Sequence, residues 1–336
     1  FGIRHHLAHQ PDAQCFGSVH NVAGQRHFGR LGVAHHMRQQ PGATIAGDVS
    51  NTGLIDMAGE GAIGVILDRD NNTPTTIGGK ILNSGSIIAT GEDALGIEVE
   101  TATSALRIEN SGLVSADGTE ARGVLFYNGT IDYILNTGTL EAKGTDASAF
   151  EFQGATFATN SASGARGIVN RGTITADGTA ILVNAAEQTS PFEINQQAGE
   201  IRSNSGVAVD AANLATLNWT GGAIVGDLLD LSAVNVAGQA NFTGSRIIAP
   251  VSVNSGSLNL AAQGTAITGD LNVANGAGID MHLSDSVVPT TAYLTVNGNA
   301  TFANASKLTV SANPGDFAST NDGTQYTLLQ ATSVQD

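Results

Sequence analysis

Residues 168–183 read IVNRGTITADGTAILV, and near-copies of the centre of this stretch recur along the chain. Each copy has Asn-x-Gly, a short run of alternating aliphatic residues and a second glycine. Copies begin at Asn51, Asn83, Asn110, Asn136 and Asn170, and a weaker copy begins at Gln197. Their first glycines, Gly53, Gly85, Gly112, Gly138, Gly172 and Gly199, are spaced 32, 27, 26, 34 and 27 residues apart. A period of this length predicts a repeat architecture.

Each repeat is expected to be two short strands joined by tight turns. In Asn-x-Gly we expect glycine to adopt positive φ and asparagine to bond to its own backbone. Residues 173–176 alternate, so Ile174 and Ala176 should share a buried face. Asp177 and Gly178 form the next turn, and residues 180–183 form a second strand. Two strands this short cannot bury a face unless copies stack upon one another.

The repeats therefore predict an all-β protein, a right-handed parallel β-helix of about a dozen rungs and roughly 60 Å in length. The asparagines that open the repeats should stack at one corner as an amide ladder, which departs from the pattern at Gln197. A propeller blade needs about 40 residues and aromatic signatures that are missing here. A sandwich would not repeat one motif so regularly.

Composition agrees with strands and excludes some partners. Among 336 residues there are 42 glycines, while only 5% are aromatic and 13% are charged. The net charge of −16 argues against nucleic-acid binding, which requires clusters of Lys and Arg. The single cysteine, Cys15, cannot form an intrachain disulfide. The sequence shows no apolar run long enough for a membrane helix and no apolar signal segment at its N-terminus.

Three segments are predicted. Residues 1–42 are an atypical His/Arg-rich segment with seven of the eight histidines and a net charge of +3, from four arginines and one acid; the other 10 basic and 29 acidic residues give −19. Residues 43–290 carry the β-helix repeats. Residues 291–336 are a capping, autochaperone-like region, in which Phe317, Tyr326 and Leu328 would cover the final rung.

The histidines of residues 1–42 could ligate a metal through the spacing of His5, His6 and His9 or the pair His35 and His36. Structural zinc sites, however, normally have a defined Cys/His framework, which this segment lacks. We therefore expect no metal and no cofactor.

Catalytic chemistry is not expected either. A pair of carboxylates for glycoside hydrolysis could come from Asp68 and Asp70, from Asp227 and Asp230, or from Asp280 and Asp285 with His282 between them. Acids on the outer face of a strand are usually only solvated. No Gly-x-Ser-x-Gly elbow and no phosphate-binding loop occur.

Other residues singled out are Trp219, read as a core plug rather than a sugar-stacking platform, and Arg171, which replaces the Ser or Thr of its sibling repeats. The longest insertions between rungs are expected around residues 68–76, 127–133 and 150–163. A binding epitope, if present, would lie on these loops.

The Asn-[Ser/Thr]-Gly-x-[Ile/Leu] rungs, the low Cys and Lys content and the acidic charge resemble passenger domains of Gram-negative autotransporters, the type V secretion family, across residues 43–336. The segment Gly323-Thr-Gln-Tyr-Thr-Leu-Leu-Gln-Ala331 resembles the Tyr-x-Leu-Leu stretch that closes pertactin-like β-helices. The resemblance implies export to the cell surface or outside the cell through a C-terminal outer-membrane β-barrel, the translocator that would be this chain's partner.

We accordingly expect a non-catalytic adhesive or structural module that binds host or matrix glycans or proteins, or associates with itself. One alternative is the stalk of an autotransporter with a protease or esterase domain upstream, which the full reading frame would reveal. Another is a polysaccharide-active β-helix enzyme, which depolymerisation abolished by Asp280→Asn would support.

Overall fold

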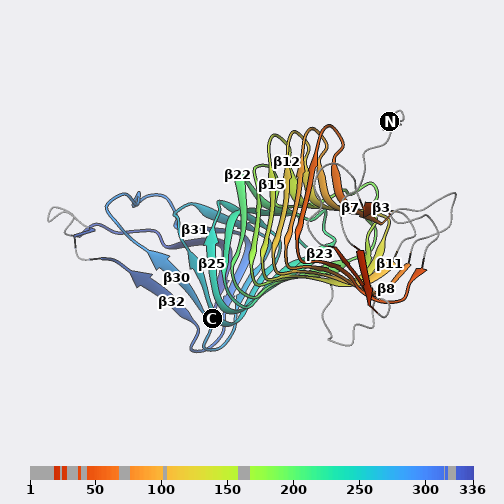
Figure 1. Cartoon of the computed structure of the whole chain (residues 1–336). Helices are drawn as coiled ribbons and strands as arrows, with labels where there is room; N and C mark the ends of the chain where they lie inside the picture. The colour runs from red at the N-terminus through yellow and green to blue at the C-terminus, as the bar shows by residue number, and fades with distance from the viewer. Residues whose placement is uncertain are drawn as a thin grey trace.

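The computed structural model describes residues 19–22, 25–28, 37–38, 44–67, 76–100, 104–157, 167–313, 315–316 and 323–336. These residues are all-β, as predicted, and their strands pair in parallel from one rung to the next, with one antiparallel pair. The result is an elongated parallel β-solenoid (Figure 1). None of the described residues forms a helix that could cross a membrane.

The strands stack in three columns. The first column holds β5 (Val49–Asn51), β8 (Thr76–Asn83), β11 (Ser104–Asn110), β14 (Thr130–Asn136), β18 (Gly167–Asn170), β21 (Phe192–Gln196), β23 (Ala215–Trp219), the first parts of β25 (Ala233–Thr243) and β27 (Val251–Leu260), β29 (Leu271–Val273) and the last part of β31 (Leu294–Phe302). Two short strands, β4 (Thr44–Ile45) and β17 (Thr156–Phe157), pair with its outer ends.

The second column follows the Asn-x-Gly corner. It holds β6 (Leu54–Ala58), β9 (Ser86–Thr90), β12 (Leu113–Asp117), β15 (Thr139–Lys143), β19 (Thr173–Ala176), the first parts of β22 (Glu200–Asp210) and β24 (Ala223–Leu229), the last parts of β25 and β27, β30 (Gly278–His282) and β32 (Lys307–Ser311).

The third column holds β3 (Met37–Arg38), β7 (Ile63–Leu67), β10 (Leu95–Val99), β13 (Arg122–Tyr127), β16 (Ser148–Gln153), β20 (Ile181–Val183), the last parts of β22 and β24, β26 (Arg246–Ile248), β28 (Thr265–Thr268), the first part of β31 and β33 (Leu329–Gln335). Only two strands per repeat were predicted from the sequence. The strand that was not predicted is the first-column strand, which ends on the asparagine of the Asn-x-Gly corner.

Alternating side chains fill the space between the columns. In the second column Ile55, Ile87, Val114, Leu140 and Ile174 lie in register and are at most 1% exposed. Ile174 and Ala176 are both buried, as predicted. A stack of phenylalanines lies in the core and includes Phe126, Phe150, Phe152, Phe157 and Phe192. Because in-register rungs place like side chains over one another, each core layer continues the one below.

The predicted amide ladder is confirmed. Each asparagine Nδ2 donates to the side-chain oxygen of the next rung at 2.8–2.9 Å, through Asn51, Asn83, Asn110, Asn136, Asn170 and finally Gln196. The predicted departure at Gln197 is therefore wrong by one residue. Gln196 pairs with Asn170 because its corner has one extra residue before Gly199, and the longer side chain still reaches the ladder.

The positive φ predicted for the first glycine is wrong for most repeats, although Gly199 does have it, at φ 68°. Gly85, Gly112, Gly138 and Gly172 do not have positive φ. A Cβ on Gly138 would instead lie 2.2 Å from the carbonyl oxygen of Gly112 on the preceding rung. These corners need glycine because the backbones of adjacent rungs approach too closely for any side chain.

Within residues 1–42 the described strands are β1 (Val19–Val22), β2 (Gln25–Phe28) and β3, although no hydrophobic period predicts them. β1 pairs antiparallel with β2, and β2 pairs in parallel with β5. At the other end Tyr326 and Leu328 pack against the core, as expected of a covering segment. Leu308 and Val310 of β32 nevertheless remain 38% and 40% exposed. Phe317 lies outside the described residues.

Candidate functional site

The carboxylates singled out from the sequence have separate structural surroundings. Asp68 and Asp70 lie outside the described residues. Asp227 is buried, and its Oδ1 accepts the backbone N–H groups of Ser245 and Arg246, while its Oδ2 lies 2.8 Å from Arg246 Nε. Burial raises the pKa of Asp227, but the hydrogen bonds from Arg246 and Ser245 outweigh it and lower that pKa. This carboxylate therefore ties two rungs together.

Asp230, the proposed partner of Asp227, lies in a turn at φ 49°. Its charge acts on a different residue. Burial first, and the charge of Asp230 second, raise the pKa of Asp210 above its ordinary value.

Asp280 and His282 do lie on the same outward side of β30, as predicted from their spacing. Their contacts diverge, however. Ser257 Oγ donates to Asp280 Oδ2 at 2.5 Å, whereas His282 Nε2 lies 3.1 Å from Asp316 Oδ2. Asp285 is exposed, and its backbone N–H donates to a carbonyl oxygen rather than its carboxylate joining the other two groups. Asp280 is thus bonded to the preceding rung, whereas His282 and the Asp285 backbone contact Asp316.

His282 also contacts a serine. Ser311 Oγ lies 3.2 Å from His282 Nδ1, so serine, histidine and Asp316 follow one another in a row. The hydroxyl of Ser311 donates to the Met281 carbonyl oxygen at 3.2 Å, which directs its proton toward the backbone and away from the imidazole. The imidazole and the carboxylate are 41% and 22% exposed. These polar contacts are best explained as a structural link on the surface that holds β30 to β32 and to the residues that follow it.

Trp219 is fully buried in the first column, which agrees with the prediction of a core plug. Arg171 is exposed and donates through Nε to Gln197 Oε1 at 2.7 Å. The loop expected at residues 127–133 is wrong, because β13 and β14 are joined by a tight corner at Asn128, whose φ is 62°. Residues 150–153 belong to β16 and the core; residues 68–75 and 158–163 lie outside the described part.

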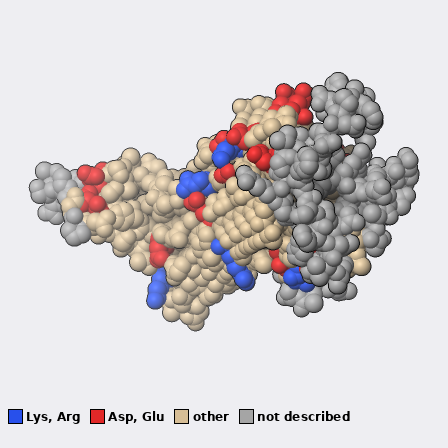
Figure 2. Space-filling view, viewed as in Figure 1, with Lys and Arg blue, Asp and Glu red and all other residues tan. Residues whose placement is uncertain are grey.

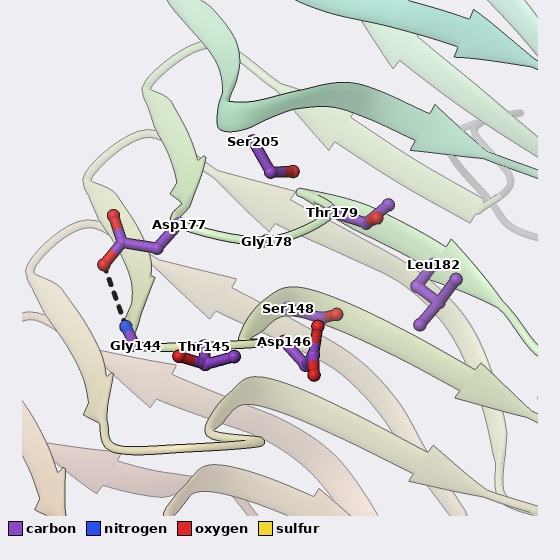
Figure 3. Close-up of a pocket in the computed structure, with 9 residues that line it drawn as sticks. All are labelled: Gly144, Thr145, Asp146, Ser148, Asp177, Gly178, Thr179, Leu182 and Ser205. Carbon is purple, nitrogen blue, oxygen red and sulfur yellow. Dashed lines mark hydrogen bonds between the residues drawn. The ribbon is translucent and has the colours of Figure 1, made fainter.

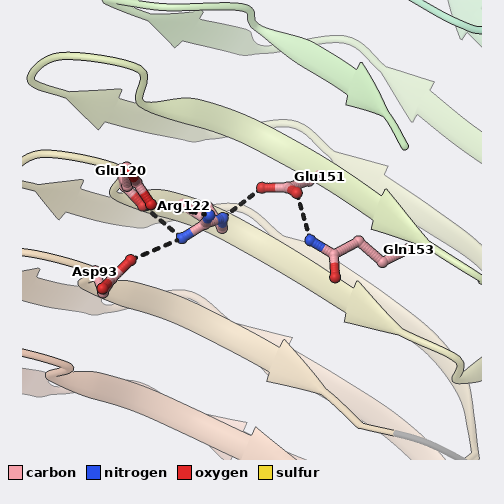
Figure 4. Close-up of polar contacts among 5 residues, drawn as sticks. All are labelled: Asp93, Glu120, Arg122, Glu151 and Gln153. Carbon is pink, nitrogen blue, oxygen red and sulfur yellow. Dashed lines mark hydrogen bonds and ion pairs between the residues drawn. The ribbon is translucent and has the colours of Figure 1, made fainter. Parts of the chain in front are cut away.

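A polar network crosses three rungs of the third column (Figure 4). Arg122 bonds to Glu151, lies 3.3 Å from Asp93 Oδ1 and donates to the Glu120 carbonyl oxygen at 2.6 Å. Gln153 donates to Glu151 in turn. Burial lowers the pKa of Arg122, but the charges and hydrogen bonds of Glu151 and Asp93 together outweigh it, so that pKa is raised. In this network Arg122 is paired with Asp93 and Glu151, so its guanidinium is not free to bind a ligand. Within the described residues, no three His, Cys, Asp or Glu side chains gather closely enough to hold a metal ion.

A ridge of protruding turns joins the second and third columns. We call residues 59–62, 91–94, 118–121 and 144–147 the turn ridge; it forms the row of narrow loops at the top of Figure 1. Each turn reads Gly-x-[Gly/Asp/Glu]-Ala, and its third residue is left-handed, with φ of 65°, 56°, 55° and 55° at Gly61, Asp93, Glu120 and Asp146. Acidic side chains gather over this part of the surface (Figure 2).

Each ridge turn bonds to the next through two backbone N–H groups. The first glycine donates 2.8–2.9 Å bonds from Gly59, Gly91 and Gly118 to the oxygens of Thr90, Asp117 and Lys143. The third residue donates 2.8–2.9 Å bonds from Gly61, Asp93 and Glu120 to the oxygens of Glu92, Thr119 and Thr145. The ridge thus continues the solenoid ladder outside the core.

The ridge stops abruptly after its fourth turn. Ala142 pairs with Ala176 and Phe150 pairs with Ile181, so residues 143–149 lie opposite residues 177–180 and the new turn is three residues shorter. The missing residues leave a hollow of about 590 Å³, which we call the step pocket (Figure 3). It is lined by Gly144, Thr145, Asp146, Ser148, Asp177, Gly178, Thr179, Leu182 and Ser205.

The last ridge turn has two backbone N–H groups, those of Gly144 and Asp146, and they differ in their hydrogen bonding at the step. The N–H of Gly144 donates to Asp177 Oδ2 at 2.8 Å, so a carboxylate replaces the missing carbonyl oxygen. This hydrogen bond, followed by one from Asn204 to Oδ1, lowers the pKa of Asp177. The N–H of Asp146 has no acceptor among the described residues. One backbone donor is therefore left at the pocket wall.

The step pocket was not predicted from the sequence. The signal was present as a difference in spacing, because Ala142 to Phe150 spans eight positions and Ala176 to Ile181 spans five. It could be recognised only once the register of the third column was known.

No model of a known protein family matches the chain, and comparisons with curated proteins and with solved structures find no match.

Proposed function

We propose that this chain is a surface-exposed autotransporter passenger that acts as a non-catalytic adhesive or structural module. In this proposal the solenoid is a right-handed β-helix of about a dozen rungs, closed at its C-terminal end by residues 291–336. The repeated Asn-x-Gly corners and the terminal Tyr-x-Leu-Leu stretch support the family assignment. The structural roles of Asp227, Asp280 and His282 support the non-catalytic part.

A strip of uncharged polar side chains carries the adhesive part of the proposal. The outward positions of the first column align Asn195, Asn218, Asn235, Ser252, Asn272 and Thr301 in register, and we call them the amide strip. Asn218 Nδ2 donates to Asn195 Oδ1 at 3.2 Å, and Asn235 Nδ2 donates to Asn218 Oδ1 at 3.1 Å.

The strip offers a partner a row of fixed amide and hydroxyl groups at the rung spacing of about 4.8 Å. Because Asn195, Asn218 and Asn235 are already ordered by one another, binding there would immobilise few free side chains. The six side chains of the strip are uncharged, although the Glu193 carboxylate lies beside Asn218. Their chemistry favours partners with hydroxyl or amide groups, such as glycans or extended protein segments, over ionic ones.

The test is adhesion of cells that display the chain. We expect bacteria displaying it through a fused translocator to adhere to glycan- or matrix-coated surfaces. Asn218→Asp should reduce adhesion by introducing a charge into the strip. Thr268→Asp adds the same charge at an exposed position of another column, on β28, and should leave adhesion unchanged. Equal adhesion by both variants and the parent would contradict the role of the strip. Separately, polysaccharide cleavage by the purified chain would contradict the proposal that it is non-catalytic.

A further inference from the structure

The step pocket has an unsatisfied donor next to an unused carboxylate. The Asp146 N–H lacks the acceptor that Gly61, Asp93 and Glu120 find on the following turn. The same residue is held at φ 55°, a left-handed conformation that is strained for a non-glycine residue. Strained backbone beside a free polar group is a feature of binding sites, and here it stands in a hollow of about 590 Å³.

The groups around this donor are hydroxyls and carboxylates. Thr145, Thr179 and Ser205 bring hydroxyl groups to the pocket, and Asp146 brings an exposed carboxylate (Figure 3). Each oxygen of Asp177 already accepts one hydrogen bond, from Gly144 or from Asn204, so Asp146 supplies the carboxylate that has no bonded partner in the described structure. Among the described residues, no Lys, Arg or aromatic side chain lines the pocket.

We infer that the step pocket is a binding subsite for a neutral saccharide. A sugar hydroxyl both accepts and donates, so one hydroxyl can accept the Asp146 N–H while another donates to the Asp146 carboxylate. The hydroxyls of Thr145, Thr179 and Ser205 supply further partners of either kind. The half-buried Leu182 offers the only large aliphatic surface in the lining for the C–H groups of a sugar ring.

The lining disfavours the other ligand classes. The carboxylates of Asp146 and Asp177 outnumber the one nearby cation, Lys143, whose charge acts on Asp177, and this excess of negative charge disfavours phosphates and acidic sugars. A divalent cation would need several more oxygen ligands of fixed geometry than the one carboxylate left free. A peptide that added a strand to the ridge edge would need a row of free backbone groups, whereas the step leaves one N–H.

The inference goes beyond the proposed adhesive function and lies in another part of the rung from the amide strip, so the two can fail separately. The experiment is amide chemical-shift mapping of the isotope-labelled chain against a panel of neutral disaccharides built from glucose, galactose or mannose. We expect saturable shifts centred on the amides of residues 145–148 and 177–179, with a dissociation constant on the order of 1 mM for so polar and shallow a site.

Two variants test the site without threatening the fold. Asp146→Gly keeps the turn, since Gly61 occupies the same position, and should weaken binding roughly tenfold or more by removing the charged acceptor. Its control, Glu120→Gly, makes the same change one rung earlier, inside the ridge, and should leave binding unchanged. Inserting Gly-Thr-Asp between Asp177 and Gly178 restores the full-length turn, fills the step and should abolish binding.

Several outcomes would overturn the inference. One is the absence of shifts with every disaccharide while the spectrum shows a folded chain. Another is undiminished binding by the insertion variant. A third is a Ca²⁺ titration that shifts the residue 146 and 177 amides while the saccharides do not, which would identify a cation site instead.

Discussion

The two halves of the solenoid fill the same corner position in opposite ways. In the N-terminal half the last residue of each first-column strand is a buried amide, from Asn51 to Gln196. In the C-terminal half the residues in register with them are Trp219, Val236, Val253, Val273 and Phe302. A buried corner can thus be polar or apolar. A polar corner requires that every rung provide a partner for the next, because an unpaired buried amide is costly.

The junction between these halves shows how such a ladder ends. The Gln196 side-chain amide donates to the carbonyl oxygens of Ala198 and Gly199, at 2.9 and 3.3 Å. It therefore needs no hydrogen-bond acceptor from the next rung. Trp219 then begins the apolar column, and its Nε1 is buried without a hydrogen-bond partner in the described residues. The long glutamine side chain is therefore the terminator of the ladder.

The largest effect is expected at this junction. Trp219→Ala should lower the free energy of unfolding by about 3–5 kcal/mol, because a fully buried indole leaves a large cavity. Trp219→Phe is the matched control; it removes the unpaired N–H together with part of the ring and should cost clearly less. Urea unfolding of both variants measures the difference. Equal losses would show that the indole N–H has a partner.

A break within the amide ladder should have the next largest effect. Asn136→Ala removes the hydrogen bonds that the Asn136 side chain makes with Asn110, Asn170 and the Thr173 carbonyl oxygen, and it should cost about 3 kcal/mol, at about 1 kcal/mol for each bond lost. Val236→Ala, at the same rung position in the apolar half, removes only two methyl groups and should cost about 1.5–2 kcal/mol. Local hydrogen exchange around each site reports the loss, and a smaller loss for Asn136→Ala would contradict the ladder's role.

The turn ridge provides a smaller effect of opposite sign. Asp146→Gly relieves a left-handed conformation and should raise the free energy of unfolding by about 0.5–1 kcal/mol, once the flexibility of glycine is discounted. Glu120→Gly should gain less, because Glu120 lies 3.8 Å from Arg122 in a partly exposed ion pair. A loss of stability in both variants would show that the acidic side chains hold the ridge together.

The smallest expected effect is the opposite dependence on pH of the contributions that Asp177 and Asp210 make to stability. Asp177 has a lowered pKa in the folded state, so its contribution is present above the unfolded value of about 3.9 and is lost as pH falls through the folded pKa. Asp210 has a raised pKa, so its penalty is absent at low pH and develops as pH rises through that folded pKa.

At neutral pH, Asp177→Asn should therefore destabilise the fold and Asp210→Asn should stabilise it, each by less than about 1 kcal/mol. Both differences from the parent chain should vanish in acid. Thermal unfolding at neutral and acidic pH checks the signs, and a shared sign would refute the assignment.

The repeat architecture and the amide ladder could be predicted from the sequence because both depend on periodicity. Ile174, Ala176 and the Asn-x-Gly corners carry that signal directly. The reason for the corner glycines could not be predicted, because the close approach of Gly138 to the Gly112 carbonyl is a contact between rungs. The step pocket was missed for a related reason: its existence depends on how two turns of unequal length align in space.

The most direct test of the account is the exchange rate of the asparagine side-chain amides. If the ladder is continuous, the Nδ2 protons of Asn83, Asn110, Asn136 and Asn170 should exchange slowly with solvent and should all lose protection together in Asn136→Ala. The amide of exposed Asn304 serves as the reference for fast exchange. Side-chain amides at the corners that exchange as fast as that of Asn304 would contradict the stacked solenoid.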